Sequence, residues 1–312
     1  YHVGIASVRP FAAAAVCATV NRARGRNLDF GTQSKAAFAK EAGAMQDTFF
    51  GPPDIQVATR RAKAFFAIAR DDPDLAWSGR FVSLADYETG GLEKFLNLIR
   101  LQGASPAYWI PIEAAVDVEN ALKDEGFRPD RFEYVVSEGD SLARARGILA
   151  RYSLGDDLEV TRLEAESSDD DIEAFAEVAV AGGVLPPPAS VMRGECRRGV
   201  FLIARDKASG RAVSCGAGIE NFHAKSCRSD HVFWGMLSTL PEWRGRKIAL
   251  ILGAQAMVSL FENYGFSKFT TGVRADNAGS MALCEKLDML PGKWCTFVGM
   301  DPAAFTSERV TK

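Results

Sequence analysis

The basic loop that follows Pro241 is the segment whose residue types could do chemistry. Residues 244–249 read Arg-Gly-Arg-Lys-Ile-Ala, after a β-rich stretch and before a long apolar stretch. The first amides of a helix have no partner within the helix, and together with the helix dipole they attract anions. Arg244, Arg246 and Lys247 add positive charge at the same place. The segment therefore predicts a binding site for a pyrophosphate.

A second segment, Asn277–Met289, has the pattern of a capped helix. It reads Asn-Ala-Gly-Ser-Met-Ala-Leu-Cys-Glu-Lys-Leu-Asp-Met. Asparagine is among the residue types that cap helix starts, because its side-chain oxygen accepts from a free backbone amide. The segment predicts a helix that begins at Asn277.

The elements that must position these two segments alternate in type. Hydrophobic periodicity and turn residues predict strands at 158–163, 200–205, 212–222, 231–240, 268–273 and 294–300. They predict helices at 169–181, 192–198, 244–264 and 277–289. The order β-α-α-β-β-β-α-β-α-β predicts a mixed α/β layer fold.

The first half of the chain is harder to interpret. The pattern predicts helices at 33–45, 60–70, 91–101, 113–126 and 140–152, strands at 107–111 and 131–136, and a buried helix or strand at 11–20. The order from 91 to 136 resembles the order from 244 to 300, which indicates a weak internal repeat. A turn at 154–157 predicts a boundary near residues 151–157 between two domains, residues 1–152 and 153–312.

Taken together, segments 244–249 and 277–289 resemble the acyl-CoA signatures of the GNAT superfamily of N-acyltransferases. The first signature is Gln/Arg-x-x-Gly-x-Gly/Ala at a helix start. Here its first and last positions match, whereas its fourth, normally glycine, is Lys247. The second is Asn-x-x-Ala-x-x-Leu-Tyr-Glu-Lys-Leu-Gly-Phe, in which Asn277, Leu283 and Glu-Lys-Leu match. The resemblance covers the second half well and the first half only faintly.

The resemblance implies a GNAT-like α/β fold with a mixed sheet and two similar halves. Residues 1–152 would be a degenerate GNAT-like or accessory domain, and residues 153–312 the catalytic acetyltransferase domain. Acetyl-CoA would be the co-substrate, with no metal. The residues expected to bind it are Leu237, Ser238, Thr239, Arg244, Gly245, Arg246, Lys247, Ile248, Ala249 and Asn277.

The implied reaction is direct attack of an amine on the thioester, which needs a base for the amine and polarisation of the thioester oxygen. In many members of the family a carboxylate in the middle of the strand is the base, but that position here is Phe233. Glu220 and His231 are equal candidates, and a water relay is the alternative. Cys284 occupies the position of the family's acidic tyrosine, so it is either a proton donor or a packing residue. The acidic residues at 169–171 either stabilise the start of a helix or attract a cationic amine to the acceptor site.

Composition limits the partners. The formal net charge of −3 gives no broad basic field, so nucleic acid is not expected. No apolar stretch reaches the ~20 residues that span a bilayer, so a membrane partner is not expected either. The six cysteines lack metal-site spacing, and we expect buried free thiols in the cytoplasm, with disulfides in a secreted protein as the alternative.

Three functions remain open at this point. The first is an acetyltransferase that acts on a small-molecule or peptide amine. The second is a catalytically weak CoA-binding sensor or scaffold, which the replacements at Lys247, Cys284 and Phe233 favour. The third is a transferase for a longer acyl or an aminoacyl group. The acceptor is not encoded in a readable motif, and a homodimer is left open.

Overall fold

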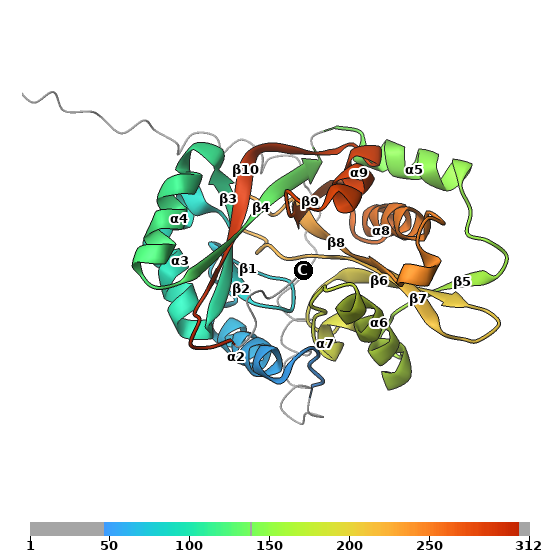
Figure 1. Ribbon diagram of the computed structural model, residues 1–312, viewed down its shortest axis with the longest axis horizontal. Coiled ribbons are helices and arrows are strands. Elements are labelled where there is room, and N and C mark those ends of the chain that lie inside the picture. The colour runs from blue at the N-terminus through green and yellow to red at the C-terminus, as the bar shows by residue number, and fades with distance from the viewer. Residues whose placement is uncertain (1–46, 138, 306–312) are drawn as a thin grey trace, which may run out of the picture. The chain divides into compact units, whose positions relative to one another are not determined.

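A computed structural model describes residues 47–137 and 139–305 of the chain (Figure 1). Within them, ten strands form one mixed sheet in the order β1-β2-β3-β10-β4-β9-β8-β7-β6-β5. The mixed α/β fold expected from the sequence is confirmed. The elements expected at 11–20 and 33–45 lie outside the described residues.

The strands are β1 (Leu75–Trp77), β2 (Val82–Leu84), β3 (Ala104–Pro111), β4 (Arg128–Ser137), β5 (Leu158–Arg162), β6 (Gly199–Asp206), β7 (Ala212–Ile219), β8 (His231–Thr239), β9 (Lys268–Val273) and β10 (Met289–Met300). The helices are α2 (Pro53–Ala69), α3 (Tyr87–Gln102), α4 (Ala115–Asp124), α5 (Ser141–Arg151), α6 (Asp169–Ala181), α7 (Ala189–Met192), α8 (Ile248–Tyr264) and α9 (Ala278–Lys286). Two 3-10 turns, η3 (Ile112–Ala114) and η4 (Pro241–Trp243), precede α4 and the loop before α8.

Two expected helices differ from the observed ones. The helix expected at 192–198 is instead the single turn α7, which closes when the amide of Glu195 donates to the Ser190 carbonyl at 2.9 Å. The helix expected from Arg244 begins only at Ile248, because the backbone at Lys247 is left-handed. The loop before α8 is therefore longer than the sequence pattern indicates.

The internal repeat is visible in the topology. Both halves contain the order strand, helix, strand, helix, strand: β2-α3-β3-α4-β4 and β8-α8-β9-α9-β10. In each half the first two of these strands are parallel neighbours. The last strands are exchanged, since β4 lies between β9 and β10 while β10 lies between β3 and β4. Each half thus completes its part of the sheet with a strand of the other.

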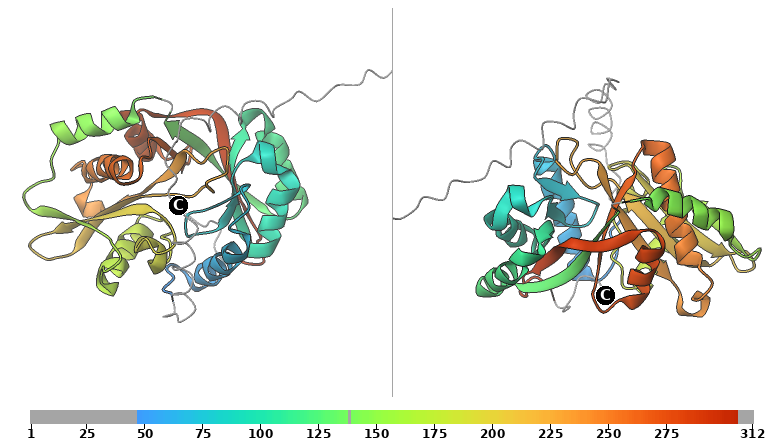
Figure 2. Two further views of the ribbon diagram at one scale, coloured as in Figure 1. Left: turned by 180° about the vertical axis from the view of Figure 1, so that it is seen from behind. Right: turned by 90° about the horizontal axis from the view of Figure 1, so that it is seen from above.

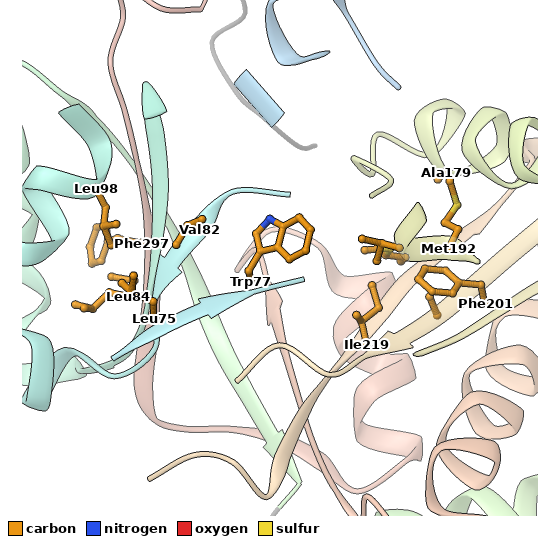
Figure 3. Close-up of a cluster of buried hydrophobic side chains, with 14 of the residues drawn as sticks. Leu75, Trp77, Val82, Leu84, Leu98, Ala179, Met192, Phe201, Ile219 and Phe297 are labelled. Carbon is orange, nitrogen blue, oxygen red and sulfur yellow. The ribbon is translucent and has the colours of Figure 1, made fainter. Parts of the chain in front are cut away.

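Two large apolar clusters hold the helices to the sheet. One contains side chains of α5, α8 and α9, and α5 lies beside α8 (Figure 2). The other joins both halves: Trp77 of β1 lies between Val82 of β2 and a group that includes Phe201 of β6 and Met192 of α7 (Figure 3). Phe297 of β10 belongs to the same cluster. The division at residue 152 stays a prediction, since strands and core side chains from both sides of it share one sheet.

Within the described part of the chain, no helix has the length and apolar character needed to cross a membrane. Among the described cysteines, Cys215, Cys284 and Cys295 are buried free thiols, as expected, whereas Cys196 is half-buried and Cys227 is exposed. The sixth, Cys17, lies outside the described residues. No group of three or more metal-ligating side chains is found among the residues that the structure describes.

Candidate active site

The strands β8 and β9 separate partway along their length. They pair only where His231–Phe233 faces Lys268–Thr270, whereas β8 continues to Thr239. A cavity of about 780 Å³ opens beyond Phe233, between Gly235–Thr239 on one side and Thr270–Val273 on the other. Backbone groups on this edge of β8 have no partner strand in the described part of the sheet. They are therefore available to a ligand.

A bulge in β8 lies at the mouth of this gap. The register of β7 with β8 shifts between Cys215 and Ala217, and Met236 has a left-handed backbone with φ of 53°. A non-glycine residue in this region stores of order 1–3 kcal/mol of strain, and such strain is concentrated at functional sites. The bulge turns the β8 backbone toward the cavity just before the predicted Leu237–Thr239. The Ser238 hydroxyl is already used, since it donates to the Val178 carbonyl at 2.7 Å.

The start of α8 is an open anion site. Gly245 has φ of 81°, a conformation that glycine adopts readily, and Lys247 has φ of 61°. No side chain caps the helix, and its first turn holds no acidic residue. The amides of Ile248, Ala249 and Leu250 thus have no partner within the helix. The Lys247 ammonium lies over the Tyr152 ring at 5.0 Å, so the side chain does not cover these amides.

The left-handed backbone of Lys247 explains why the family pattern has glycine there, and it yields a prediction. A side chain in this conformation costs about 1–2 kcal/mol. Replacing Lys247 by glycine relieves this strain, but part of the stability gained is lost because glycine gives the unfolded chain more conformational freedom. We expect Lys247→Gly to be more stable than Lys247→Ala by about 1 kcal/mol. Urea unfolding of the two variants measures the difference, and a more stable alanine variant would contradict the assigned backbone.

The corresponding helix start in the first half is closed. Helix α3 begins after Asp86, whose carboxylate accepts from the Glu88 amide at 2.9 Å and from Arg228 Nε at 2.6 Å. The negative charge expected at a helix start is therefore supplied by the protein itself. Of the two related helices, only α8 leaves its first amides to a ligand.

Arg244 and Arg246 point in different directions. Arg244 lines the cavity, and its Nε donates to the Thr239 carbonyl at 3.1 Å. Arg246 does not line it, since both oxygens of Asp157 accept from its Nη2, at 2.7 and 2.9 Å. The Arg246 side chain is therefore not placed as the sequence pattern suggested. Its pairing with Asp157 directs it away from the cavity.

Helix α9 forms the far side of the same end of the cavity. Asn277 caps it by accepting from the Ser280 amide at 3.0 Å, and Asn277, Ser280 and Cys284 all line the cavity. Burial and the nearby Glu285 raise the pKa of the Cys284 thiol to about 12. Proton transfer from such a thiol to a thiolate with a pKa of about 8.5 is uphill. Cys284 is therefore suited to packing rather than to proton donation.

Comparisons with known proteins place this arrangement in a family. Residues 171–289 match the model of the Acetyltransferase (GNAT) family. This segment is a GNAT domain. No curated protein matches the chain.

One solved structure extends the likeness in fold beyond residues 171–289, and two others are reported beside it. The chain is similar to a GCN5-related N-acetyltransferase from Kribbella flavida, with a TM-score of 0.50 and 17% identity over 79% of this chain and 96% of that one. A GCN5-related N-acetyltransferase-like protein from Streptococcus suis 89/1591 has a TM-score of 0.48 and 14% identity over 72% of this chain and 82% of that one. A tandem GNAT protein from the clavulanic acid biosynthesis pathway has a TM-score of 0.44 and 15% identity over 68% of this chain and 68% of that one. The 79% of this chain covered by the Kribbella flavida structure is more than residues 171–289, so part of the first half also shares its fold.

Neither candidate base lies in the cavity of the GNAT domain. Glu220 forms an ion pair with Arg198, whose Nε donates to it at 2.9 Å. His231 lies at the closed end, where β8 and β9 are still paired, and its Nδ1 is 2.7 Å from the Asp230 carboxylate. The ring of Trp109 packs against His231 at 5.0 Å. Spacing along the strand put these residues near the site, but neither side chain reaches it.

The acidic run 169–171 is also held away from the cavity. Ser168 caps α6, Asp169 pairs with Arg193, and Asp171 pairs with Arg205. These carboxylates stabilise the start of α6, which is the helix-start role. None of them lines the cavity.

Side chains of the first half complete the site, and they were not predicted from the sequence. Arg80 in the β1–β2 turn, Tyr108 of β3 and Tyr134 of β4 line the far end of the cavity, with Asn221 after β7. Burial raises the pKa of Tyr134 well above its ordinary value. The one signal available was the Trp-Ser-Gly-Arg sequence at 77–80, which is typical of a turn.

Proposed function

We propose that the protein is an N-acyltransferase that moves the acetyl group of acetyl-CoA to an amine by direct attack. One observation carries the proposal: a single cavity joins the uncapped start of α8 to the unpaired edge of β8 and continues to aromatic side chains of the first half. The first place suits a diphosphate, the second a thioester and the third an acceptor. The family of the GNAT domain supports acyl transfer.

The residues at the start of α8 fit the diphosphate of CoA. Free amides at 248–250 offer hydrogen bonds, and the helix dipole adds a partial positive charge. Arg244 lines the cavity beside them. Asn277 and Ser280 of α9 face the same space. All of these groups are donors or cations, or can act as donors, as an anionic co-substrate requires.

Acetyl-CoA supplies an activated thioester, and the β8 edge supplies what the thioester needs. Fixed backbone amides near the Met236 bulge stabilise negative charge that develops on the thioester oxygen. The divergence of β8 from β9 at Phe233 leaves these amides without strand partners. Positioning and backbone electrostatics are therefore the main contributions of the chain to catalysis.

The proton of the amine leaves through water. Among the described residues, no aspartate, glutamate or histidine lines the cavity. As the N–C bond forms and the C–S bond breaks, water accepts the amine proton and the sulfur leaves as a thiolate. Cys284, with its raised pKa, stays a neutral thiol throughout. This is the water-relay alternative of the sequence analysis.

The water relay predicts that both side-chain base candidates are dispensable. We expect Glu220→Gln and His231→Asn to keep kcat/KM within about twofold of the wild type, because removal of a true general base costs ~10²–10⁴-fold. The logarithm of kcat/KM should rise by one per pH unit until the acceptor amine is deprotonated. No inflection from Cys284 is expected below pH 10, since its pKa is raised to about 12. A loss above about 30-fold in either variant would restore that residue as the base.

A thiol-release assay with acetyl-CoA and a panel of amines tests the function itself. Calorimetry with CoA on the same preparation measures cofactor binding independently. Release above the uncatalysed rate with at least one amine is expected. Measurable CoA binding without release for any amine would instead support a CoA-binding sensor. Propionyl-CoA and longer acyl-CoAs in the same assay separate acetyl transfer from transfer of a larger group.

A further inference from the structure

Arg80 places an unbalanced positive charge at the acceptor end of the cavity. Its guanidinium lies over the Phe233 ring at 4.7 Å and lines the cavity. Among the described residues it forms no ion pair and its side chain donates no hydrogen bond. Burial lowers the pKa of Arg80, against an opposing effect of Tyr108. A half-buried guanidinium that has lost part of its hydration without gaining an anion is costly, so an anionic ligand there is favourable.

The turn that carries Arg80 is fixed in position. Trp77 Nε1 donates to the Arg80 carbonyl at 3.3 Å, and Trp77 itself is buried in the cluster that joins both halves. Gly79 has φ of 88°, and a Cβ added there would lie 2.5 Å from Pro187 Cβ. The turn is therefore packed tightly against the segment between α6 and α7. Arg80 is held in place before any ligand binds, which lowers the cost of binding.

Further hydrogen-bonding groups surround the guanidinium. Asn221 uses its Oδ1 to accept from the Phe233 amide at 3.1 Å, which leaves its Nδ2 as a donor. No hydrogen bond within the described residues uses that Nδ2 or the Ser78 hydroxyl, and both residues line the cavity. A planar anion on Arg80 could therefore receive hydrogen bonds from more than one side. Bidentate geometry of this kind is what a guanidinium offers to a carboxylate.

Three other cations of the cavity have partners or expected partners. Arg274 is paired with Asp130 and Asp276. Arg244 and Lys247 lie at the start of α8, where the phosphates of CoA would balance them. Lys286 also lines the cavity but is exposed to solvent, so once CoA is bound Arg80 is the half-buried cation of the described lining that still lacks a counterion. With no carboxylate among the described lining residues, a cationic acceptor such as a polyamine is repelled rather than attracted.

From these contacts we propose that the acceptor is an amine that also carries a carboxylate, and that Arg80 binds this carboxylate. The inference rests on the proposed acyl transfer. Phe233 beneath Arg80 and Gly235 at the bulge are about 7 Å apart along β8. A short peptide, or an amino acid whose amine is at the end of a side chain, spans this separation between its carboxylate and its amine. Arg80 thus selects the acceptor, while the β8 edge holds the thioester.

The test compares each acid with its own amide in three proteins. The probes are glycylglycine, 6-aminohexanoate and L-lysine, their amides, and O-phosphoethanolamine as a phosphate-bearing amine. The proteins are the wild type, Arg80→Gln and Arg60→Gln. Arg60 is the matched control, since its guanidinium also lies 4.7 Å over a ring, that of Phe49, but does not line the cavity. Both kcat/KM with acetyl-CoA and calorimetric binding to the CoA-loaded protein are measured.

Arg80→Gln should lower kcat/KM for the preferred acid ~10–100-fold and for its amide less than threefold, because one charge-assisted interaction is lost. Arg60→Gln should change neither. The acid-to-amide ratio of kcat/KM is compared between the wild type and each variant. This comparison cancels the difference in amine pKa between acid and amide, and any difference in folding between the proteins. Equal losses on acid and amide, or preference for the phosphate-bearing amine, would overturn the carboxylate assignment.

Binding measurements separate the two possible failures. If the wild-type protein does not bind CoA, the proposed function is refuted. Intact CoA binding combined with equal affinity of wild type and Arg80→Gln for every acid would refute only the role of Arg80. If no probe is acetylated, the affinity of the acids for the CoA-loaded protein still decides the matter. Absence of any Arg80-dependent binding in that experiment overturns the inference.

Discussion

Arg244→Glu is expected to weaken CoA binding about 100-fold. The substitution removes a charge-assisted hydrogen bond worth about 1.5–3 kcal/mol and adds a repulsion of roughly 1 kcal/mol against the diphosphate. We take a value near the lower end, because Arg244 is exposed and water screens its charge. Titration calorimetry with CoA measures the change. An affinity within threefold of the wild type would show that the diphosphate binds elsewhere.

The loop contains its own matched control. Arg244→Gln and Arg246→Gln remove the same charge two residues apart, but only Arg244 lines the cavity. Arg244→Gln should weaken CoA binding about tenfold, and Arg246→Gln less than threefold. Equal effects of the two variants would indicate a general field of positive charge rather than a specific contact.

A fragment of residues 153–312 is expected not to fold and not to bind CoA. This fragment lacks β4, which lies between β9 and β10 in the sheet. It also lacks α5, whose Ala145 and Ile148 pack in the cluster around α8. One edge of β9, both edges of β10 (which also loses β3) and an apolar helix face would be exposed, which favours aggregation over a stable fold. Circular dichroism should show no cooperative unfolding transition, in contrast to the full chain.

Supplying the missing strand should reverse this loss. When residues 1–152 are produced together with 153–312, we expect the two pieces to purify as a complex that binds CoA. A fragment of 153–312 that unfolds cooperatively and binds CoA alone would instead support two separate domains. It would also show that β4 contributes little to the stability of the sheet.

The sequence was informative where one segment determines its own structure. The capped start of α9 at Asn277 and the loop before α8 follow from local residue types and backbone chemistry. The exact start of α8 was missed, since the left-handed conformation of Lys247 is set by the loop and not by lysine. The sequence also did not predict that β4 and β10 each pair with strands of the other half. An alternating pattern predicts a strand and its faces but not the identity of its neighbours.

The acceptor end was not predictable, because it is assembled from parts distant in sequence. Arg80 lies between two strands of three residues each, which are too short to give a periodic signal. Glu220 and His231 were chosen by their position along strands. The structure shows that the point where β8 and β9 separate decides which positions reach the cavity, and His231 lies on the wrong side of it. That point depends on the register between two strands.

A crystal structure with bound CoA tests the central claim most directly. We expect density for the diphosphate within hydrogen-bonding distance of the amides at residues 248–250, with the pantetheine arm running along the β8 edge from Thr239 toward Gly235. Density for CoA at any other place, or a cavity filled by the protein's own side chains in the CoA complex, would contradict it.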